Sequence, residues 1–218
     1  MAESEQEWRV FCAVALPEET KRAIGDYVAQ LKRADAARYW RFSPVENLHL
    51  TLKFIGEIPP ARVDALREAT ARAVEGSTSF RLRVGGLGAF PPRTARPRVL
   101  WLGLEEPDTT DANDPTPALA RLQRKLEDEC QRFGFAREAK TFHPHLTLAR
   151  ARHAGRGESQ PRALRPQELE QQTGRFASIE FAVRALTIFR SELTPQGSRY
   201  TEISLAGFRA IDGAGSGG

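Results

Sequence analysis

Cysteine, histidine and methionine are scarce in this sequence, and their scarcity narrows its possible functions. The 218 residues include two Cys, four His and one Met. Cys12 lies in an apolar run and Cys130 in a helical pattern, and neither has a Cys or His neighbour at a zinc-ligand spacing. We therefore expect two buried free thiols rather than a disulfide framework or a zinc site.

Long apolar runs are also missing. No stretch approaches the roughly 20 apolar residues that a membrane-spanning helix needs. The first residues, Met1 to Glu7, are acidic and lack the basic and apolar regions of a signal peptide. We expect a cytoplasmic protein without membrane contact, and nothing in the sequence indicates an oligomer, so we expect a monomer.

The overall composition is that of an ordinary globular protein. Hydrophobic residues make up 40% and charged residues 28%, and the net charge is +4 with a pI of about 9.4. This length can bury a substantial core in one domain or in two joined lobes. The modest basic excess permits an anionic partner without requiring one.

Apolar periodicity and turn residues predict alternating strands and helices. Expected strands cover residues 8–16, 39–42, 80–84, 98–104, 178–192 and 199–205, with two more beginning near residues 48 and 145; expected helices cover 17–31, 60–75, 118–133 and 166–173. Residues 85–92 are predicted to be a turn-rich connection, and 105–117 and 150–160 surface loops. Without the glycine fingerprint of a doubly wound sheet, the pattern favours an α+β fold.

One tetrapeptide, His-Leu-Thr-Leu, occurs twice, at residues 49–52 and 145–148. Successive side chains of a strand point to opposite faces, so His and Thr share one face and the leucines share the other. Two such strands facing one another would form a cleft with two imidazoles and two hydroxyls. Each half of the chain contains one copy and an amphipathic helix, which suggests an internal duplication.

Paired histidines are suited to concerted acid–base catalysis near neutral pH. One neutral ring can take a proton from attacking water while a protonated ring gives one to the leaving oxygen. Threonine hydroxyls can donate hydrogen bonds to anionic oxygens, so a phosphodiester fits the set. A strained 2′,3′-cyclic phosphate would need no metal. The spacing of His143 and His145 also occurs in metal sites, but Asp and Glu are absent from residues 141 to 154, which disfavours a metal.

Other residues near the motifs could bind substrate. Arg150 lies three residues beyond Thr147, is expected to point off the strand's end, and could hold a phosphate. Lys53 follows Thr51 with the strand period of two and is expected to share the face of His49, as a second phosphate ligand. The aromatic rings of Phe11 and Tyr200 could stack on a base. Residues expected to be structural or solvated are His143, His153, Arg152, Arg156, Arg162 and Arg165.

The motifs and their surroundings resemble the RNA 2′,3′-cyclic phosphodiesterases, historically called 2′-5′ RNA ligases, of the 2H phosphoesterase superfamily. The resemblance covers about residues 8–208. The matching blocks are residues 9–17, 46–57, 142–150 and 191–200. We therefore expect one domain over residues 8–208, with disordered tails at 1–7 and 209–218.

The resemblance implies a bilobal α+β fold in which two pseudo-symmetric lobes, with antiparallel sheets and outer helices, surround a central cleft. It implies cofactor-free hydrolysis of RNA 2′,3′-cyclic phosphate ends to 2′-phosphomonoesters, with 2′-5′ joining of RNA ends as a secondary, reverse reaction. The family's roles carry over to His49 as proton donor and His145 as proton acceptor, with Thr51 and Thr147 on the phosphate oxygens. The residues alone leave the direction of proton transfer open. They also leave open an RNA-binding module without turnover, and an enzyme acting on another small cyclic nucleotide.

Overall fold

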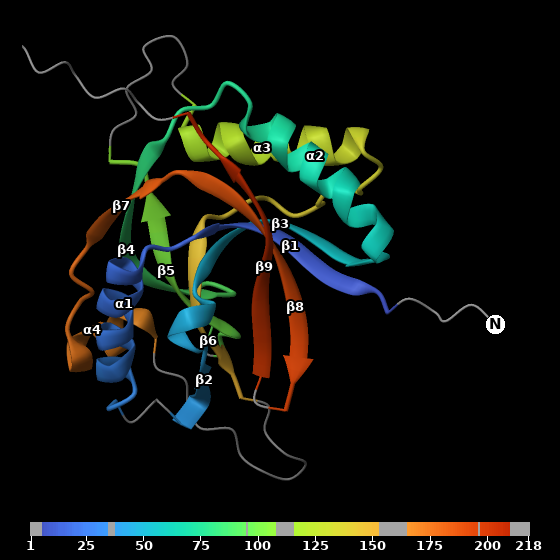
Figure 1. Cartoon of the computed structure of the whole chain (residues 1–218). Helices are drawn as coiled ribbons and strands as arrows, with labels where there is room; N and C mark the ends of the chain where they lie inside the picture. Colours follow the sequence, from blue (N-terminus) through green and yellow to red (C-terminus); the bar gives the residue numbers. More distant parts are fainter. Residues whose placement is uncertain are drawn as a thin grey trace, which may run out of the picture.

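Two antiparallel sheets form the body of the protein in the computed structural model, which describes residues 6–34, 38–94, 96–107, 116–152, 165–195 and 197–209 (Figure 1). The first sheet has the order β3 (His49–Ile58), β1 (Trp8–Ala15), β8 (Ala185–Thr194), β9 (Gly197–Gly207). The second has the order β2 (Trp40–Phe42), β6 (His145–Ala151), β5 (Val99–Glu105), β4 (Phe80–Phe90), β7 (Ile179–Val183). We call them sheet A and sheet B. Every neighbouring pair in both sheets is antiparallel.

Helices cover the outer face of each sheet. Helices α2 (Val63–Val74) and α3 (Ala118–Arg132) pack on one another and on sheet A, whereas α1 (Glu18–Leu31) and α4 (Pro166–Thr173) pack on sheet B (Figure 1). Single 3₁₀ turns, Val45–Asn47 and Pro60–Arg62, precede β3 and α2. The expected α+β fold of two antiparallel lobes with outer helices is confirmed.

The two lobes repeat one arrangement in space, but they do not correspond to the two halves of the chain. In each sheet the strand with the His-x-Thr motif, β3 or β6, lies beside an earlier strand, β1 or β5, and a helix comes between the two in the sequence. Sheet A takes β1 and β3 from the start of the chain and β8 and β9 from its end. The two lobes that carry the motifs are therefore interleaved along the sequence.

The leucines of both motifs are core residues. Leu50, Leu52, Leu146 and Leu148 are at most 2% exposed, on the helix-covered faces of their sheets. The expected alternation therefore holds in both copies, and each His and Thr faces away from the helices. Both cysteines are buried free thiols, as expected.

The prediction of a turn-rich connection at residues 85–92 is wrong over most of that range, because β4 continues to Phe90. One of the glycines that suggested a turn, Gly88, instead makes room for a neighbouring ring. Gly88 lies opposite Trp101 of β5, and a Cβ on Gly88 would come within 2.2 Å of the indole. Glycine in a strand here reflects close packing rather than a reversal of the chain.

Parts of several predictions lie outside the described residues. These are positions 1–5 and 210–218 of the tails, His153, Arg156, Arg162, and most of both predicted surface loops. Arg209, assigned to the tail, forms a parallel bridge with Thr78. Within the described ranges no helix is both long and apolar enough to cross a membrane.

Candidate active site

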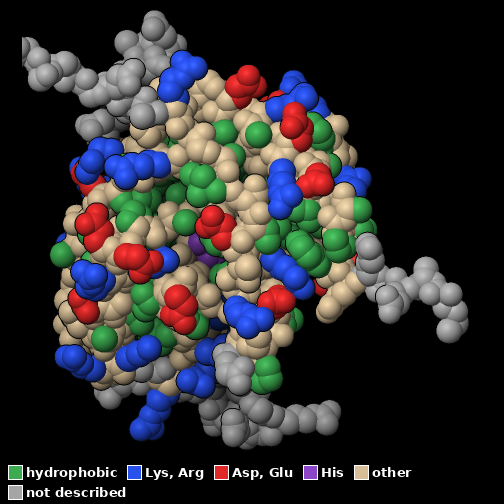
Figure 2. Space-filling view, in the orientation of Figure 1, with side chains coloured by type: hydrophobic (Ala, Val, Ile, Leu, Met, Phe, Trp, Pro, Cys, Tyr) green, Lys and Arg blue, Asp and Glu red, His purple; other side chains and the backbone are tan. Residues whose placement is uncertain are grey.

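The two His-x-Thr strands approach one another between the sheets and line one cavity of about 250 Å³. Figure 2 shows histidine at the bottom of a hollow in the middle of the visible face. The lining contains all four predicted motif residues, His49, Thr51, His145 and Thr147. The other lining residues are Arg41, Phe42, Ser43, Pro44, Asn47, Phe54, Arg150, Gly197, Ser198 and Tyr200.

Both imidazoles are held in the same way by the backbone two residues upstream. Nδ1 of His49 lies 2.7 Å from the carbonyl oxygen of Asn47, and Nδ1 of His145 lies 2.6 Å from that of His143. A carbonyl can only accept, so each Nδ1 carries the proton that is donated. Nε2 of each ring is then left to exchange a proton in the cavity.

Aromatic rings back each histidine. His49 packs against Phe11 at 4.7 Å between ring centroids, and meets Tyr200 edge-on at 5.1 Å. His145 meets Phe90 edge-on at 5.1 Å and lies 6.3 Å from Trp101. These contacts remove water from one side of each imidazole and fix its orientation.

The surroundings of both histidines favour the neutral ring. Burial lowers the pKa of His49 to about 4, helped by the positive charge of Arg150 and opposed by the hydrogen bond to Asn47. Burial also lowers the pKa of His145, again helped by Arg150. Near pH 7 both imidazoles of the free protein are therefore neutral. Either ring could act as a proton donor only after protonation, which a bound anion such as a phosphate would favour.

A β-bulge follows the threonine in both copies. Thr51 pairs with Ala13 and Lys53 with Cys12, so Leu52 is the extra residue of β3. In β6, Thr147 pairs with Trp101 and Ala149 with Leu100, so Leu148 is extra. A bulge shifts the alternation of side chains by one residue. Phe54 and Arg150, at equivalent positions beyond the two bulges, therefore both line the cavity.

The prediction that Lys53 shares the face of His49 is wrong because of this bulge. The Lys53 side chain is 1% exposed and points to the helix side of sheet A. Its Nζ lies 2.6 Å from Glu127 Oε2 of α3 and donates to the carbonyl of Ala136 at 2.7 Å. A buried and fully paired ammonium cannot reach a phosphate in the cavity.

Two of the other predicted substrate-binding residues line the cavity, and one does not. Arg150 lines the cavity from within β6 rather than pointing off the end of a strand, and Tyr200 lines it from β9. Phe11 is only 2% exposed and packs beneath His49, so its ring faces are not open to a base. The His143 side chain is exposed, and its backbone carbonyl accepts the hydrogen bond from Nδ1 of His145.

Among the lining residues that sequence reasoning missed are Arg41, Asn47 and Phe54. Phe54 could have been found by aligning the two copies beyond the tetrapeptide, since it corresponds to Arg150. Asn47 carries the carbonyl that holds His49, and its side chain donates to the Ser198 carbonyl at 2.6 Å, joining the 3₁₀ turn before β3 to the tip of the β8–β9 hairpin. Only the pairing of β2 with β6 brings Arg41 to the cavity.

No group of three or more His, Cys, Asp or Glu residues that could hold a metal ion occurs in the part of the chain that the structure describes.

Comparison with known proteins places the chain in a family. The sequence model of the family described as LigT like Phosphoesterase matches residues 14–101 and 111–200. The chain is 33% identical over 199 residues to an RNA 2′,3′-cyclic phosphodiesterase of Geobacillus stearothermophilus, covering 90% of this chain and 57% of that protein. It is 32% identical over 194 residues to the RNA 2′,3′-cyclic phosphodiesterase of Thermotoga maritima, covering 88% of this chain and 91% of the relative.

The fold also resembles that of solved phosphoesterase structures. The crystal structure of Escherichia coli LigT complexed with 3′-AMP matches 93% of this chain and 99% of that chain, with a TM-score of 0.66 and 25% sequence identity. The resemblance expected from the motif blocks is confirmed. This chain belongs to the LigT-like phosphoesterase family.

Proposed function

We propose that this enzyme hydrolyses RNA 2′,3′-cyclic phosphate ends to 2′-phosphomonoesters by acid–base catalysis between His49 and His145, without a metal. The observation that carries the proposal is the pair of His-x-Thr strands on one cavity, each with Nδ1 held by a backbone carbonyl and Nε2 left free. Relatives named RNA 2′,3′-cyclic phosphodiesterases support the reaction, and the 3′-AMP complex of Escherichia coli LigT supports a nucleotide ligand.

The proposed step needs one proton on each side of the phosphorus. Nε2 of His145 takes a proton from water as the water oxygen bonds to phosphorus, and Nε2–H of His49 gives a proton to O3′ as the bond between phosphorus and O3′ breaks. The phosphate remains on O2′. Thr51 and Thr147 donate hydrogen bonds to the two non-bridging oxygens, where negative charge gathers in the transition state.

The substrate itself supplies the charge that the donor needs. His49 is neutral in the free protein at neutral pH, because burial lowers its pKa to about 4. A cyclic phosphate anion bound beside the ring favours the imidazolium and raises that pKa. Substrate binding is therefore accompanied by uptake of a proton, and the acid is formed only where it is used.

Three further parts of the proposal follow. One chain supplies both histidines and both threonines of the cavity, and we propose that the protein acts as a monomer. Tyr200 and Arg150, which line the cavity, bind the terminal nucleotide and its phosphate.

We propose 2′-5′ joining of RNA ends as a secondary reaction at the same site, with a ribose 5′-hydroxyl in the position of water.

The test is turnover of an oligoribonucleotide ending in a 2′,3′-cyclic phosphate, with EDTA present. We expect a 2′-phosphate product, and a loss of about 10³-fold or more in kcat for His49→Ala and for His145→Ala. Turnover that depends on added metal, or full activity of either variant, would contradict the mechanism. Tight binding without turnover by the intact protein would instead favour an RNA-binding module. Faster turnover of a different cyclic nucleotide would replace the proposed substrate.

A further inference from the structure

Two arginines face one another at the rim of the cavity. Arg41 of β2 is the direct cross-strand partner of Arg150 of β6, both side chains are exposed, and both line the cavity. Directly paired residues project from the same face of a sheet with their Cβ atoms roughly 5 Å apart. Two guanidinium groups are thus held side by side next to the catalytic residues.

No acidic side chain in the described part of the chain compensates this pair. Neither Arg41 nor Arg150 forms an ion pair or a side-chain hydrogen bond with any residue that the structure describes, whereas Arg81 and Arg83 of the same sheet are both paired with Glu180. Like charges directly opposite one another in a sheet are destabilising. Planar guanidinium groups bind phosphate oxygens well, so an anion between the two would offset the repulsion.

The pair lies further out along the sheet than Thr147, which is proposed to hold the reacting phosphate. Arg150 lies three residues beyond Thr147, and Arg41 lies on the edge strand one place further out. Because Leu148 is an extra residue, Thr147 and Arg150 are two ladder steps apart; at about 3.3 Å per step and about 4.8 Å between strands, the backbone of Arg41 is roughly 8 Å from that of Thr147. This separation suits a second phosphate of the same ligand.

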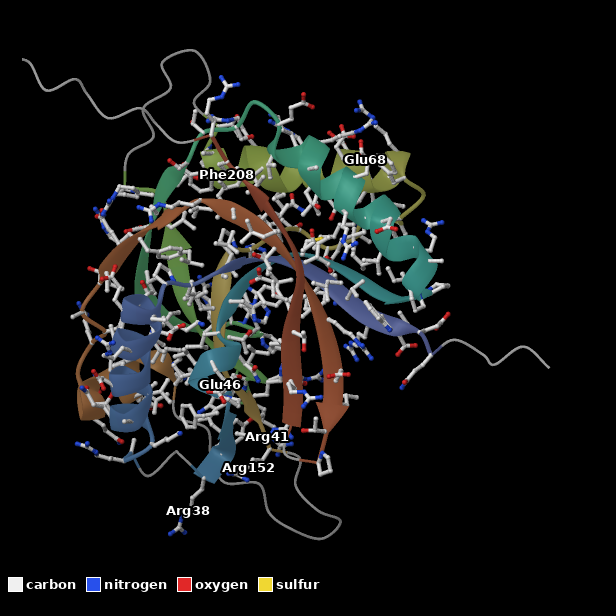
Figure 3. The ribbon with its side chains drawn as sticks, viewed as in Figure 1. Arg38, Arg41, Glu46, Glu68, Arg152 and Phe208 are labelled. Atoms are coloured by element: carbon white, nitrogen blue, oxygen red, sulfur yellow. The ribbon has the colours of Figure 1, made fainter. Side chains whose placement is uncertain are left out.

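More positive charge surrounds β2 on the outer side of the pair. Figure 3 shows Arg38, Arg41 and Arg152 gathered at the β2 end of the molecule. Arg152 is tied to this strand by a hydrogen bond from its Nε to the carbonyl of Trp40, at 3.3 Å. A polynucleotide that leaves the cavity over β2 and β6 would therefore meet further guanidinium groups.

We propose that Arg41 and Arg150 form a second phosphate subsite, which binds the phosphate on the 5′ side of the terminal nucleotide. The inference rests on the proposed function and adds a specificity to it: the enzyme selects a cyclic end that carries a 5′-phosphate or a further nucleotide. Arg41 is the residue that makes the distinction, because Arg150 also lies near both histidines, where its charge lowers their pKa.

Two substrates that differ by one phosphate test the subsite. They are adenosine 2′,3′-cyclic phosphate with a free 5′-hydroxyl and the same compound with a 5′-phosphate. For the intact enzyme we expect kcat/KM about tenfold higher for the 5′-phosphorylated compound, the effect of one charge-assisted contact. Arg41→Gln should lower kcat/KM about tenfold for that compound and no more than twofold for the other. With a dinucleotide, the slope of log kcat/KM against log salt concentration should become shallower by about 0.7.

Arg124→Gln is the matched control, because Arg124 is exposed on α3, which covers the outer side of sheet A. It should keep both rates and the salt slope. Arg41→Gln relieves a repulsion, so its melting temperature should be no lower than that of the intact protein.

An equal loss for both compounds, or no loss for either, would overturn the second subsite. If the intact enzyme hydrolyses neither these compounds nor the oligoribonucleotide with a cyclic end, the proposed function itself is wrong. Calorimetric binding of adenosine 2′,5′-bisphosphate against adenosine 2′-phosphate then tests the subsite by itself: it stands only if the bisphosphate binds more tightly and Arg41→Gln removes that difference.

Discussion

The two catalytic candidates have the same chemistry and the same backbone support, and they differ in their surroundings. Both rings donate Nδ1–H to a carbonyl two residues upstream, but the pKa of His49 is lowered to about 4 by burial among the rings of Phe11 and Tyr200. A stronger acid gives up its proton more readily once it is charged. This environment is consistent with His49 as the donor, provided that the bound phosphate supplies the opposite charge.

The lowered pKa values predict the pH dependence of catalysis. In the free enzyme the productive state needs protonated His49, with a pKa of about 4, and neutral His145, with a pKa below its usual 6.5. The population of this state falls as pH rises above both values, so kcat/KM should fall about tenfold per unit above pH 6.5. The alkaline limb of kcat should lie at higher pH, because the bound phosphate raises the pKa of His49. Steady-state kinetics from pH 5 to 9 measures both curves.

Arg124→Gln is the control for this pH profile, since that side chain is exposed on α3 and does not line the cavity. Its profile should keep the shape of that of the intact enzyme. A value of kcat/KM that rises from pH 6.5 to 8 would contradict a protonated His49 in the productive state.

Because of its bulge, strand β3 contributes side chains both to the cavity and to the buried core. Before Leu52 it presents His49 and Thr51 to the cavity, and after Leu52 it sends Lys53 into the space between sheet A and α3. There Lys53 pairs with Glu127, whose Oε2 also accepts from the backbone of Glu138 at 3.2 Å. The pair thus ties the first motif strand to α3 and to the segment that leads to His145.

Breaking this buried pair should destabilise the protein far more than removing it whole. Lys53→Met leaves Glu127 buried and unpaired, and should lower the free energy of unfolding by about 3–5 kcal/mol. The double variant Lys53→Met, Glu127→Leu should regain most of that loss, since apolar side chains can replace a buried pair. Urea unfolding at pH 7 measures the three proteins. A double variant as unstable as the single one would show that the hydrogen bond to Ala136, rather than the charge pair, dominates.

At the scale of the molecule, the chain crosses between the lobes repeatedly. From β1 in sheet A it passes to α1, which packs against sheet B, and then to β2, which is a strand of sheet B. It returns to sheet A in β3. Helix α3 follows β5 of sheet B but packs against sheet A. Neither lobe is a continuous segment, so we expect neither to fold without the other.

This interleaving predicts a single cooperative unfolding transition. Trp8 lies in sheet A, and Trp40 and Trp101 lie in sheet B, so tryptophan variants can report on each sheet alone. Trp8→Phe leaves probes in sheet B, and the double variant Trp40→Phe, Trp101→Phe leaves one in sheet A. In urea, each variant's fluorescence and far-ultraviolet circular dichroism should give the same midpoint. Separate midpoints within one variant would show that the lobes unfold independently.

The sequence by itself determined the catalytic candidates, because a strand's period of two is a local property. The spacing of His49 and Thr51, repeated at His145 and Thr147, is enough to put each pair on one face. The motif blocks around them also predicted the family and the α+β class, which the comparisons and the sheets confirm.

Only the tertiary structure decided which other residues join the site. The register shift at Leu52 moved Lys53 to the core and Phe54 to the cavity, and it depends on pairing with β1. Arg41 reached the cavity through its pairing with Arg150, more than a hundred residues away in the sequence. Local sequence patterns contain no information on which strands will pair, or in which register, because that is settled by packing between distant segments.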